Sequence, residues 1–424
     1  MSKFLVQGGV PLKGTVKVGG SKNAALPILA ATLLSTEPVT LRNVPDISDV
    51  HAFLRILSSL GAEVSFNQGT VTVNPTRLEP TQIDAHLVKH MRASILLLGP
   101  LLGRFKEVGL AYPGGCVLGK RSIQAHVHAL SALGAQLIES DEEIHMTAGT
   151  PENRSLKPAK LIMSEPSVTA TENAVMAAVT IPGTTEIRWA AMEPHVQDLC
   201  HFLVSMGADI QGVGTHTLTI HGGKALHGTD YTVTPDYLEA GTLVLATVLT
   251  NGEVTIENCP VDHLDSFWQK LEELGAKFEL GQNSVKVLPH GPLRAIENLQ
   301  TSVYPGFPTD LQAPFTVLLT QCEGETYVHE TLFEGRLNYL PELERMGANV
   351  EILNPHQAVI NGKRTLKGAP IVSQDIRAGA AMVLAALTAE GTTSISDINY
   401  IDRGYERLDE KLRSLGAKIE RIQE

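Results

Sequence analysis

A short phrase of the form Leu-x-x-(Leu/Met)-Gly-Ala occurs six times along this chain and constrains its fold more than any other feature. Each copy is typical of the last turn of an amphipathic helix, a glycine at the helix end where positive φ costs little, and the start of a strand. Repetition at this interval predicts six related structural units of about 70 residues. The copies begin at Leu57, Leu130, Leu203, Leu271, Leu343 and Leu412.

Each unit also contains a strongly apolar stretch of small residues followed by a β-rich run. The stretches, such as NAALPILAATLLS from Asn23 and RAGAAMVLAALTAEG from Arg377, are apolar nearly all round and predict buried helices. Six units exceed one hydrophobic core, so we expect an α/β fold of two domains, each with three units whose buried helices pack inside a sheet. A solenoid is the alternative, but 70 residues is longer than the common solenoid repeats.

Composition narrows the classes of function. Lys and Arg number 34 against 46 Asp and Glu, a formal net charge of −12, which argues against a nucleic-acid-binding surface. The most apolar windows, 95–102 and 378–389, are too short to span a bilayer, so we expect a cytoplasmic protein that does not bind membranes. The four cysteines contain no CxxC pair and the histidines no HExxH motif, so neither a metal site nor a disulfide scaffold is predicted. His126 and His128 are expected on opposite faces of their element.

The apolar helices begin with charged and polar residues that a buried helix does not need. If rotation relates the units within a domain, these helix starts converge at one end of each domain, and the two ends face one another as an anion site between domains. Helix N-termini and arginines both favour phosphate and carboxylate groups. Ordinary caps and surface salt bridges are the alternative for any single position. The residues are Lys22, Asn23, Arg92, Thr171, Glu172, Asp236, Glu239, Asp310, Asp375 and Arg377.

The segment GGCVLGKRS, which begins at Gly114, is close to a P-loop but has Arg121 where Ser or Thr must hold magnesium. We therefore do not predict a nucleoside triphosphatase. Cys116 lies in this glycine-bounded segment just before Lys120 and Arg121, and cationic neighbours lower a thiol pKa. Cys116 is therefore predicted to act as an acid or a nucleophile, whereas the other three cysteines are expected to be buried.

The phrases SKNAALPIL, MRASILLLGP, GGCVLGKR, PGFPTDLQA and IDRGYERLDEKL occur in this order over the whole chain. With them the chain resembles the UDP-N-acetylglucosamine enolpyruvyl transferases, or 1-carboxyvinyltransferases, of the EPSP synthase-like family. The resemblance implies two inside-out α/β barrel domains, each of three βαβαββ repeats around buried helices. It also implies a first domain at residues 22–234, which carries the Cys116 segment, and a second domain formed by residues 1–21 and 235–424.

The activity that the resemblance implies is transfer of the enolpyruvyl group of phosphoenolpyruvate to the 3′-hydroxyl of UDP-N-acetylglucosamine, at the entry to peptidoglycan synthesis. No cofactor is implied, and nothing predicts the oligomeric state. Cys116 would protonate the methylene carbon and react with fosfomycin, and Asp310 would approach the 3′-hydroxyl as base or orienting group. Lys22 and Arg403 complete the implied catalytic set. The implied substrate-binding residues are Lys22, Asn23, Arg92, Arg121, Ser122, Ile123, Gln124, Ser167, Val168, Thr169, Asp310, Leu332, Arg336, Asp375, Arg377 and Arg403.

Three positions depart from the family's usual sequence at the nucleotide. Gln124 replaces an aspartate that helps to hold uracil, Ser122 replaces a proline, and Thr169 replaces a glycine. Transfer to another nucleotide sugar is therefore one alternative, and a non-catalytic nucleotide-sugar sensor is another. The related 3-phosphoshikimate enzymes do not use the loop cysteine, so GGCVLGKR favours the sugar enzyme. Glu193 and Asp49 match acidic residues near the same cleft, and Asp375 is expected to form an ion pair with Arg377.

Overall fold

The computed structural model describes residues 2–79, 83, 85–112, 114, 123–138 and 143–423. Contacts divide the chain into two compact units. Unit 1 contains Met1–Gly19 and Pro235–Glu424, and unit 2 contains the described residues between Gly20 and Thr234. The chain therefore enters unit 2 after residue 19 and returns to unit 1 at residue 235.

Unit 2 is built around three buried helices, α1 (Lys22–Ala31), α4 (Leu98–Phe105) and α6 (Val168–Ala178). Shorter 3₁₀ segments, η1 (Thr32–Leu34) and η2 (Arg92–Leu97), adjoin the first two of these helices. The remaining helices are α2 (Ser48–Ser59), α3 (Ala85–His90), α5 (Gln124–Ala132) and α7 (Pro194–Ser205).

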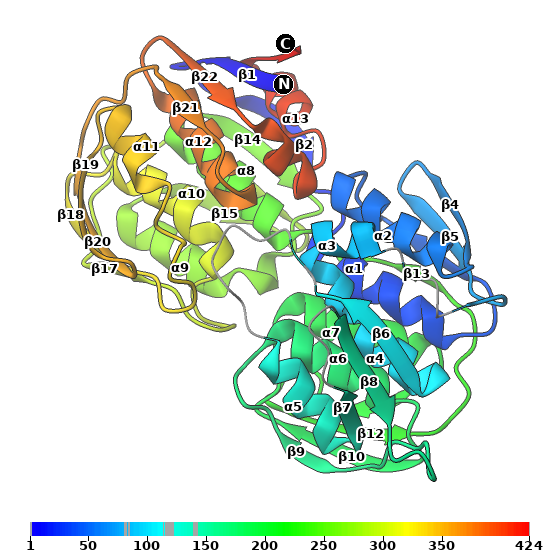
Figure 1. Cartoon of the computed structure of the whole chain (residues 1–424). Coiled ribbons are helices and arrows are strands. Elements are labelled where there is room, and N and C mark those ends of the chain that lie inside the picture. The colour runs from blue at the N-terminus through cyan, green and yellow to red at the C-terminus, as the bar shows by residue number, and fades with distance from the viewer. Residues whose placement is uncertain are drawn as a thin grey trace. The chain divides into compact units, whose positions relative to one another are not determined.

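Unit 1 repeats this plan with the buried helices α8 (Tyr237–Leu249), α10 (Thr309–Leu319) and α12 (Ile376–Thr388). In Figure 1 the three helices lie inside the sheets of the unit. The remaining helical segments are η3 (Val261–His263), α9 (Asp265–Leu274), α11 (Leu340–Arg345), η4 (Ile398–Arg403) and α13 (Leu408–Ser414).

The sheets of unit 2 follow one topology, in which the strand after a buried helix pairs antiparallel with the second strand of a hairpin. Two sheets add a parallel strand on the other side. Their orders are β13 (Asp230–Thr232), β3 (Val39–Arg42), β5 (Thr70–Asn74), β4 (Glu63–Asn67); β11 (Asp209–Gln211), β12 (Thr217–Gly222), β10 (Gly183–Arg188), β9 (Lys160–Ile162); and β6 (Glu107–Ala111), β8 (Glu143–Ala148), β7 (Ala135–Ile138).

Unit 1 has three four-stranded sheets of the same kind, and the N-terminal segment supplies a strand to two of them. β1 pairs antiparallel with β22 and β23, and β2 pairs parallel with β14. The orders are β21 (Pro370–Val372), β22 (Thr392–Ser396), β1 (Ser2–Gln7), β23 (Lys418–Gln423); β15 (Lys277–Leu280), β16 (Ser284–Leu288), β14 (Glu253–Glu257), β2 (Lys13–Lys17); and β17 (Asn298–Gln300), β18 (Gly324–His329), β20 (Gln357–Gly362), β19 (Asn349–Asn354).

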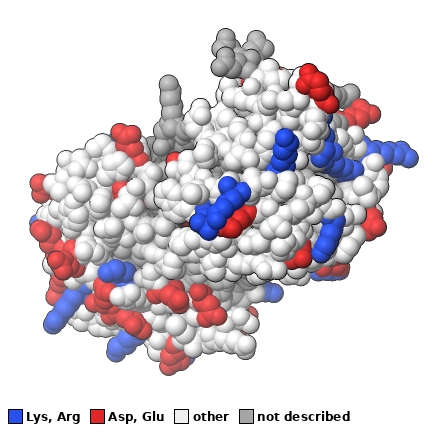
Figure 2. Space-filling view, turned by 90° about the horizontal axis from the view of Figure 1, so that it is seen from below, with Lys and Arg blue, Asp and Glu red and all other residues white. Residues whose placement is uncertain are grey.

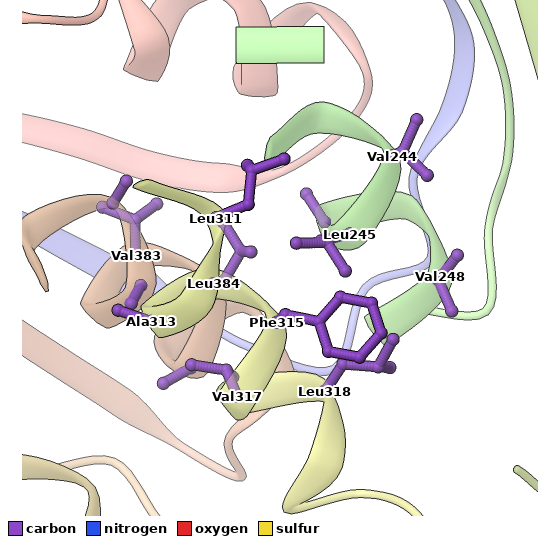
Figure 3. Packing of buried hydrophobic residues seen from close by; sticks show 14 of the residues in the cluster. Val244, Leu245, Val248, Leu311, Ala313, Phe315, Val317, Leu318, Val383 and Leu384 are labelled. Carbon is purple, nitrogen blue, oxygen red and sulfur yellow. The ribbon is translucent and has the colours of Figure 1, made fainter. Parts of the chain in front are cut away.

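The core of each unit lies where its buried helices meet. Figure 3 shows Leu245 of α8, Phe315 of α10 and Leu384 of α12 packed together, and all three are fully buried. Burial of such side chains stabilises a fold by roughly 1.5–3 kcal/mol each. Helices inside and sheets outside confirm the expected fold class. The six repeat glycines also have the predicted positive φ, between 89° and 103°.

The second repeat differs from the single buried helix predicted for it. Its stretch begins as η2 and becomes α-helical at Leu98. The side chain of Asn173 lies between the Ile95 carbonyl and the Gly99 amide, the pair that a regular helix would join: Asn173 Oδ1 accepts from Gly99 N–H at 2.7 Å, and its Nδ2 donates to Ile95 O at 2.9 Å. A Cβ on Gly99 would lie 2.5 Å from the Asn173 carbonyl oxygen, so this close approach requires glycine.

No helix within the described ranges is long and apolar enough to cross a membrane. On the face drawn in Figure 2, lysines and arginines stand among aspartates and glutamates and do not form one continuous basic area.

Candidate active site

Asp310, Arg336 and Arg377 form a compact charged cluster in unit 1. Asp310 lies in the first turn of α10, where its Oδ1 accepts from Arg336 Nη2 at 2.8 Å and its Oδ2 accepts from Arg377 Nε at 3.0 Å. The two arginines are only 4% and 3% exposed. The structure therefore brings three of the predicted site residues together, with one carboxylate shared by two buried guanidinium groups.

Tyr405 completes the surroundings of Arg377. Its ring lies beneath the guanidinium, 5.2 Å from Cζ to the ring centroid, and its hydroxyl is 3.0 Å from Thr242 Oγ1. Burial alone would lower the pKa of Arg377, but the neighbouring Tyr405 and Asp310 raise it above the ordinary arginine value. Burial also raises the pKa of Tyr405. The sequence analysis missed this residue, although it lies two positions after Arg403 in IDRGYERLDEKL.

Each arginine of the cluster keeps one buried N–H group for another acceptor. Among the described residues, Arg336 Nε and Arg377 Nη1 have no hydrogen-bond partner. Buried donors in proteins are nearly always satisfied, and the best acceptors for guanidinium groups are carboxylates and phosphates. The cluster is therefore suited to hold an anionic ligand.

Asp375 does not form the predicted ion pair with the side chain of Arg377. Its carboxylate is the N-cap of α12, where Oδ1 accepts from the backbone N–H groups of Arg377 and Ala378 at 2.7 and 2.9 Å. The unpaired donors of a helix N-terminus are satisfied in this way, and the guanidinium of Arg377 pairs with Asp310 instead. Arg403 ends η4 and is partly buried, and Leu332 is 38% exposed.

In unit 2, Lys22 is the first residue of α1 and forms a salt bridge with Asp49 in the first turn of α2. Lys22 Nζ lies 2.9 Å from Asp49 Oδ2, and the two side chains are 11% and 9% exposed. Ser21 caps the helix by accepting from the Ala24 amide at 3.3 Å. The partly buried Asn23 follows, so the first of the predicted helix starts carries both of its expected polar residues.

A hydrogen-bonded chain leads from the buried Asn173 to the partly buried Thr169. Asn173 Nδ2 donates to His126 Nδ1 at 2.8 Å, which leaves the ring proton on Nε2, 3.1 Å from Thr169 Oγ1. Burial, with a smaller effect of Arg92, lowers the pKa of His126 to about 3, so the ring is neutral. His126 is 2% exposed and His128 is exposed, which confirms that they lie on opposite faces of α5.

Glu172, in the middle of α6, is 1% exposed, and its Oε1 has no hydrogen-bond partner among the described residues. Burial, and secondly the charge of Glu193, raises the pKa of Glu172 well above that of an ordinary carboxyl group. Glu193 precedes α7 as its N-cap residue. Glu172 is therefore a buried carboxyl group inside α6, where the charged form is disfavoured, rather than an accessible charge at the helix start.

The remaining predicted positions of unit 2 lie at helix starts. Arg92 opens η2, Gln124 opens α5 after Ile123, and Val168 opens α6 after Ser167. Cys116, Arg121 and Ser122 lie outside the described residues. Within the ranges that are described, no three His, Cys, Asp or Glu side chains are grouped so that they can hold a metal ion.

Solved structures place this architecture in one class of enzyme fold. The chain is similar to the enolpyruvyl transferase NikO from Streptomyces tendae, with a TM-score of 0.89, 26% sequence identity and 99% of each chain covered. An EPSP synthase from Acinetobacter baumannii covers the whole of both chains with a TM-score of 0.74, and its 18% identity supports the fold alone.

The sequence itself matches the family model of EPSP synthase (3-phosphoshikimate 1-carboxyvinyltransferase) over residues 6–412. Proteins named UDP-N-acetylglucosamine 1-carboxyvinyltransferase from Methylacidiphilum infernorum and Koribacter versatilis are 45% and 44% identical to it, over 100% of this chain and 99% and 97% of theirs. The chain therefore belongs to the EPSP synthase family. This confirms the resemblance that its motifs indicate.

Proposed function

We propose that this protein transfers the enolpyruvyl group of phosphoenolpyruvate to the 3′-hydroxyl of UDP-N-acetylglucosamine and releases phosphate, the entry step of peptidoglycan precursor synthesis. Proteins named UDP-N-acetylglucosamine 1-carboxyvinyltransferase match the chain from end to end. The observation that carries the proposal within the site is the Asp310 cluster, where two buried arginines share one carboxylate and each keeps one N–H for an anion.

The reaction needs one proton delivered and one removed in each half. In the addition, the 3′-oxygen bonds to C2 of phosphoenolpyruvate, C3 takes a proton, and a tetrahedral ketal phosphate forms. In the elimination, C3 loses a proton and phosphate leaves C2. Cys116 is the proposed proton donor to C3, and Asp310 the carboxylate that accepts or orients the proton of the 3′-hydroxyl.

The phosphate and carboxylate of phosphoenolpyruvate need several cations. The proposed set is Lys22, Arg92, Arg121, Arg336, Arg377 and Arg403. Arginine holds such groups through paired N–H donors, and a lysine adds a point charge. Asn23 is the proposed contact to the sugar or the ketal. The two units are the proposed domains of the family, with 22–234 as the first and 1–21 with 235–424 as the second.

A second candidate acceptor is another nucleotide sugar. Gln124 is exposed at the first position of α5, where a carboxylate is usual in the family, and the Thr169 hydroxyl is held by His126 at the start of α6. Glutamine can both donate to and accept from a uracil edge but carries no charge. Measuring turnover with a series of UDP- and TDP-linked sugars distinguishes UDP-N-acetylglucosamine from another nucleotide sugar as the substrate. A preference for uridine is expected only if UDP-N-acetylglucosamine is the substrate.

The decisive experiment measures phosphate released from phosphoenolpyruvate with and without UDP-N-acetylglucosamine, for the native protein and for Cys116→Ser, with fosfomycin in parallel. We expect sugar-dependent release that fosfomycin abolishes and that Cys116→Ser lacks. Tight binding of phosphoenolpyruvate without any sugar-dependent release would refute the transferase and favour a sensor.

A further inference from the structure

Glu330 is a completely buried carboxyl group that the proposed reaction does not use. It follows β18 in unit 1 and is 0% exposed. Its side-chain oxygens accept four hydrogen bonds, all from neutral groups: the hydroxyls of Thr301 and Thr309 at 3.1 and 2.9 Å, and the backbone N–H groups of Leu332 and Phe333 at 2.9 and 3.3 Å. A carboxyl group buried without hydrogen-bond partners is costly, and here both oxygens have partners, with three donors on Oε1 and one on Oε2.

Three of the four donors belong to the two segments that carry Asp310 and Arg336, and the fourth, Thr301, follows β17. Thr309 is the first residue of α10 and directly precedes Asp310. Leu332 and Phe333 begin the loop that leads to Arg336, and the Phe333 ring lies 5.2 Å from the Arg336 guanidinium carbon. Both ends of the salt bridge between Arg336 and Asp310 are therefore tied to the same buried carboxyl group.

The rest of the pocket around Glu330 leaves it little freedom to move. Its backbone N–H donates to the His356 carbonyl at 2.8 Å, and its own carbonyl oxygen lies 2.8 Å from His356 Nδ1. Thr331 also donates two hydrogen bonds to Thr301, from its amide to Thr301 Oγ1 at 2.9 Å and from its hydroxyl to the Thr301 carbonyl oxygen at 2.8 Å. Groups held this firmly determine the geometry of the groups that they contact.

We propose that Glu330 is a positioning residue that sets the distance between Asp310 at the start of α10 and the loop carrying Leu332 and Arg336. This inference rests on the proposed function, in which Leu332 and Asp310 contact the UDP-N-acetylglucosamine that receives the enolpyruvyl group. Loss of Glu330 releases the loop from α10. Catalysis is sensitive to displacements of about 1 Å at reacting groups, so a loosened acceptor site affects both KM and kcat.

The test compares Glu330→Ala with Glu330→Gln. Glutamine has the same size, its amide oxygen can replace Oε1, and its NH₂ group can face Thr309, whose hydroxyl then accepts instead of donating. We expect Glu330→Ala to raise KM for UDP-N-acetylglucosamine and to lower kcat, each about tenfold, whereas Glu330→Gln stays within about threefold of the native protein. Asp409→Asn is the matched control, since Asp409 is another buried carboxylate of unit 1, paired with Arg413 and Arg421.

A purely structural role predicts a different result, in which Glu330→Ala lowers the amount of folded protein like Asp409→Asn and leaves KM unchanged. That result, or equal damage by alanine and glutamine, overturns the inference. Hydrogen exchange gives a readout that does not depend on the substrate. The amides of Leu332 and Phe333 should exchange at least about tenfold faster in Glu330→Ala. If the native protein shows no turnover but these amides still exchange faster in Glu330→Ala, the positioning role is supported and only the proposed function is refuted.

Discussion

Replacing Asp310 with asparagine removes the negative charge that two buried arginines share. Breaking a buried ion pair by removing one partner costs about 3–5 kcal/mol, because the remaining charge stays buried without compensation. The side chain of Asp310 is itself 24% exposed, so we expect a loss of stability at the lower end of this range, about 3 kcal/mol. For a unit of about 200 residues this corresponds to a fall of about 6–12 °C in the unfolding midpoint.

Scanning calorimetry of the native protein and Asp310→Asn, with and without inorganic phosphate, measures this loss. Phosphate should restore part of the stability of the variant, because an anion bound at the freed N–H groups of Arg336 and Arg377 replaces the missing charge. Turnover by the variant should fall by roughly 10²–10⁴-fold, the range for loss of a general acid or base.

Asp230→Asn is the control for this prediction. Asp230 also accepts two hydrogen bonds from one arginine, Arg42, but the two side chains are 53% and 55% exposed, so its loss should leave the midpoint where it is. A fall of less than about 2 °C for Asp310→Asn, or a fall no larger than that of Asp230→Asn, would refute the view that the buried arginines need this carboxylate.

Three further predictions concern buried titratable groups. His126 has a pKa of about 3 when folded and 6.5 when unfolded, so its contribution to stability is present above pH 6.5 and is lost as the pH falls. Between pH 7 and pH 5 the loss is about 2 kcal/mol. Denaturant titrations of His126→Gln should lack this pH-dependent loss, whereas those of His128→Gln should keep it. Glu172 has a raised pKa, so its contribution is present below its unfolded value and is lost as the pH rises; Glu172→Gln should therefore raise the unfolding midpoint, by more at pH 8 than at pH 5, and a lower midpoint at pH 8 contradicts this assignment. Burial raises the pKa of the thiols of Cys200, Cys259 and Cys322 to about 12, so iodoacetamide at pH 7.5 should add one group to the folded protein, which mass spectrometry locates at Cys116.

The sequence could predict features that depend on neighbours along the chain. The repeat glycines, the apolar helices and the strands after them were all predictable, because helix ends and periodic burial depend on residues three or four positions apart. The family resemblance also predicted Asp310, Arg336 and Arg377 as site residues, although nothing in the sequence indicated that one carboxylate joins two arginines 26 and 67 residues away.

Other features of the site had no local signal. Asn173 interrupts a helix 74 residues earlier in the chain, and only packing of α6 against α4 brings its amide to Gly99. Asp375 and Arg377 suggested an ion pair because they are two residues apart, yet the helix N-terminus takes the carboxylate and leaves the guanidinium for Asp310. Glu330 follows a strand, and nothing in the sequence marks it as a fully buried residue.

The repeated unit, the buried helices inside sheets and the charged helix starts could all be predicted from the sequence, since backbone propensity and hydrophobic periodicity act over a few residues. Which charges share a partner, which carboxyl groups are buried, and which hydrogen bonds hold the site depend on how the elements pack together. The physical reason is that desolvation and long-range hydrogen bonding depend on the elements that pack around a group, and the same aspartate can be a cap, a surface ion or a buried counter-ion according to that packing.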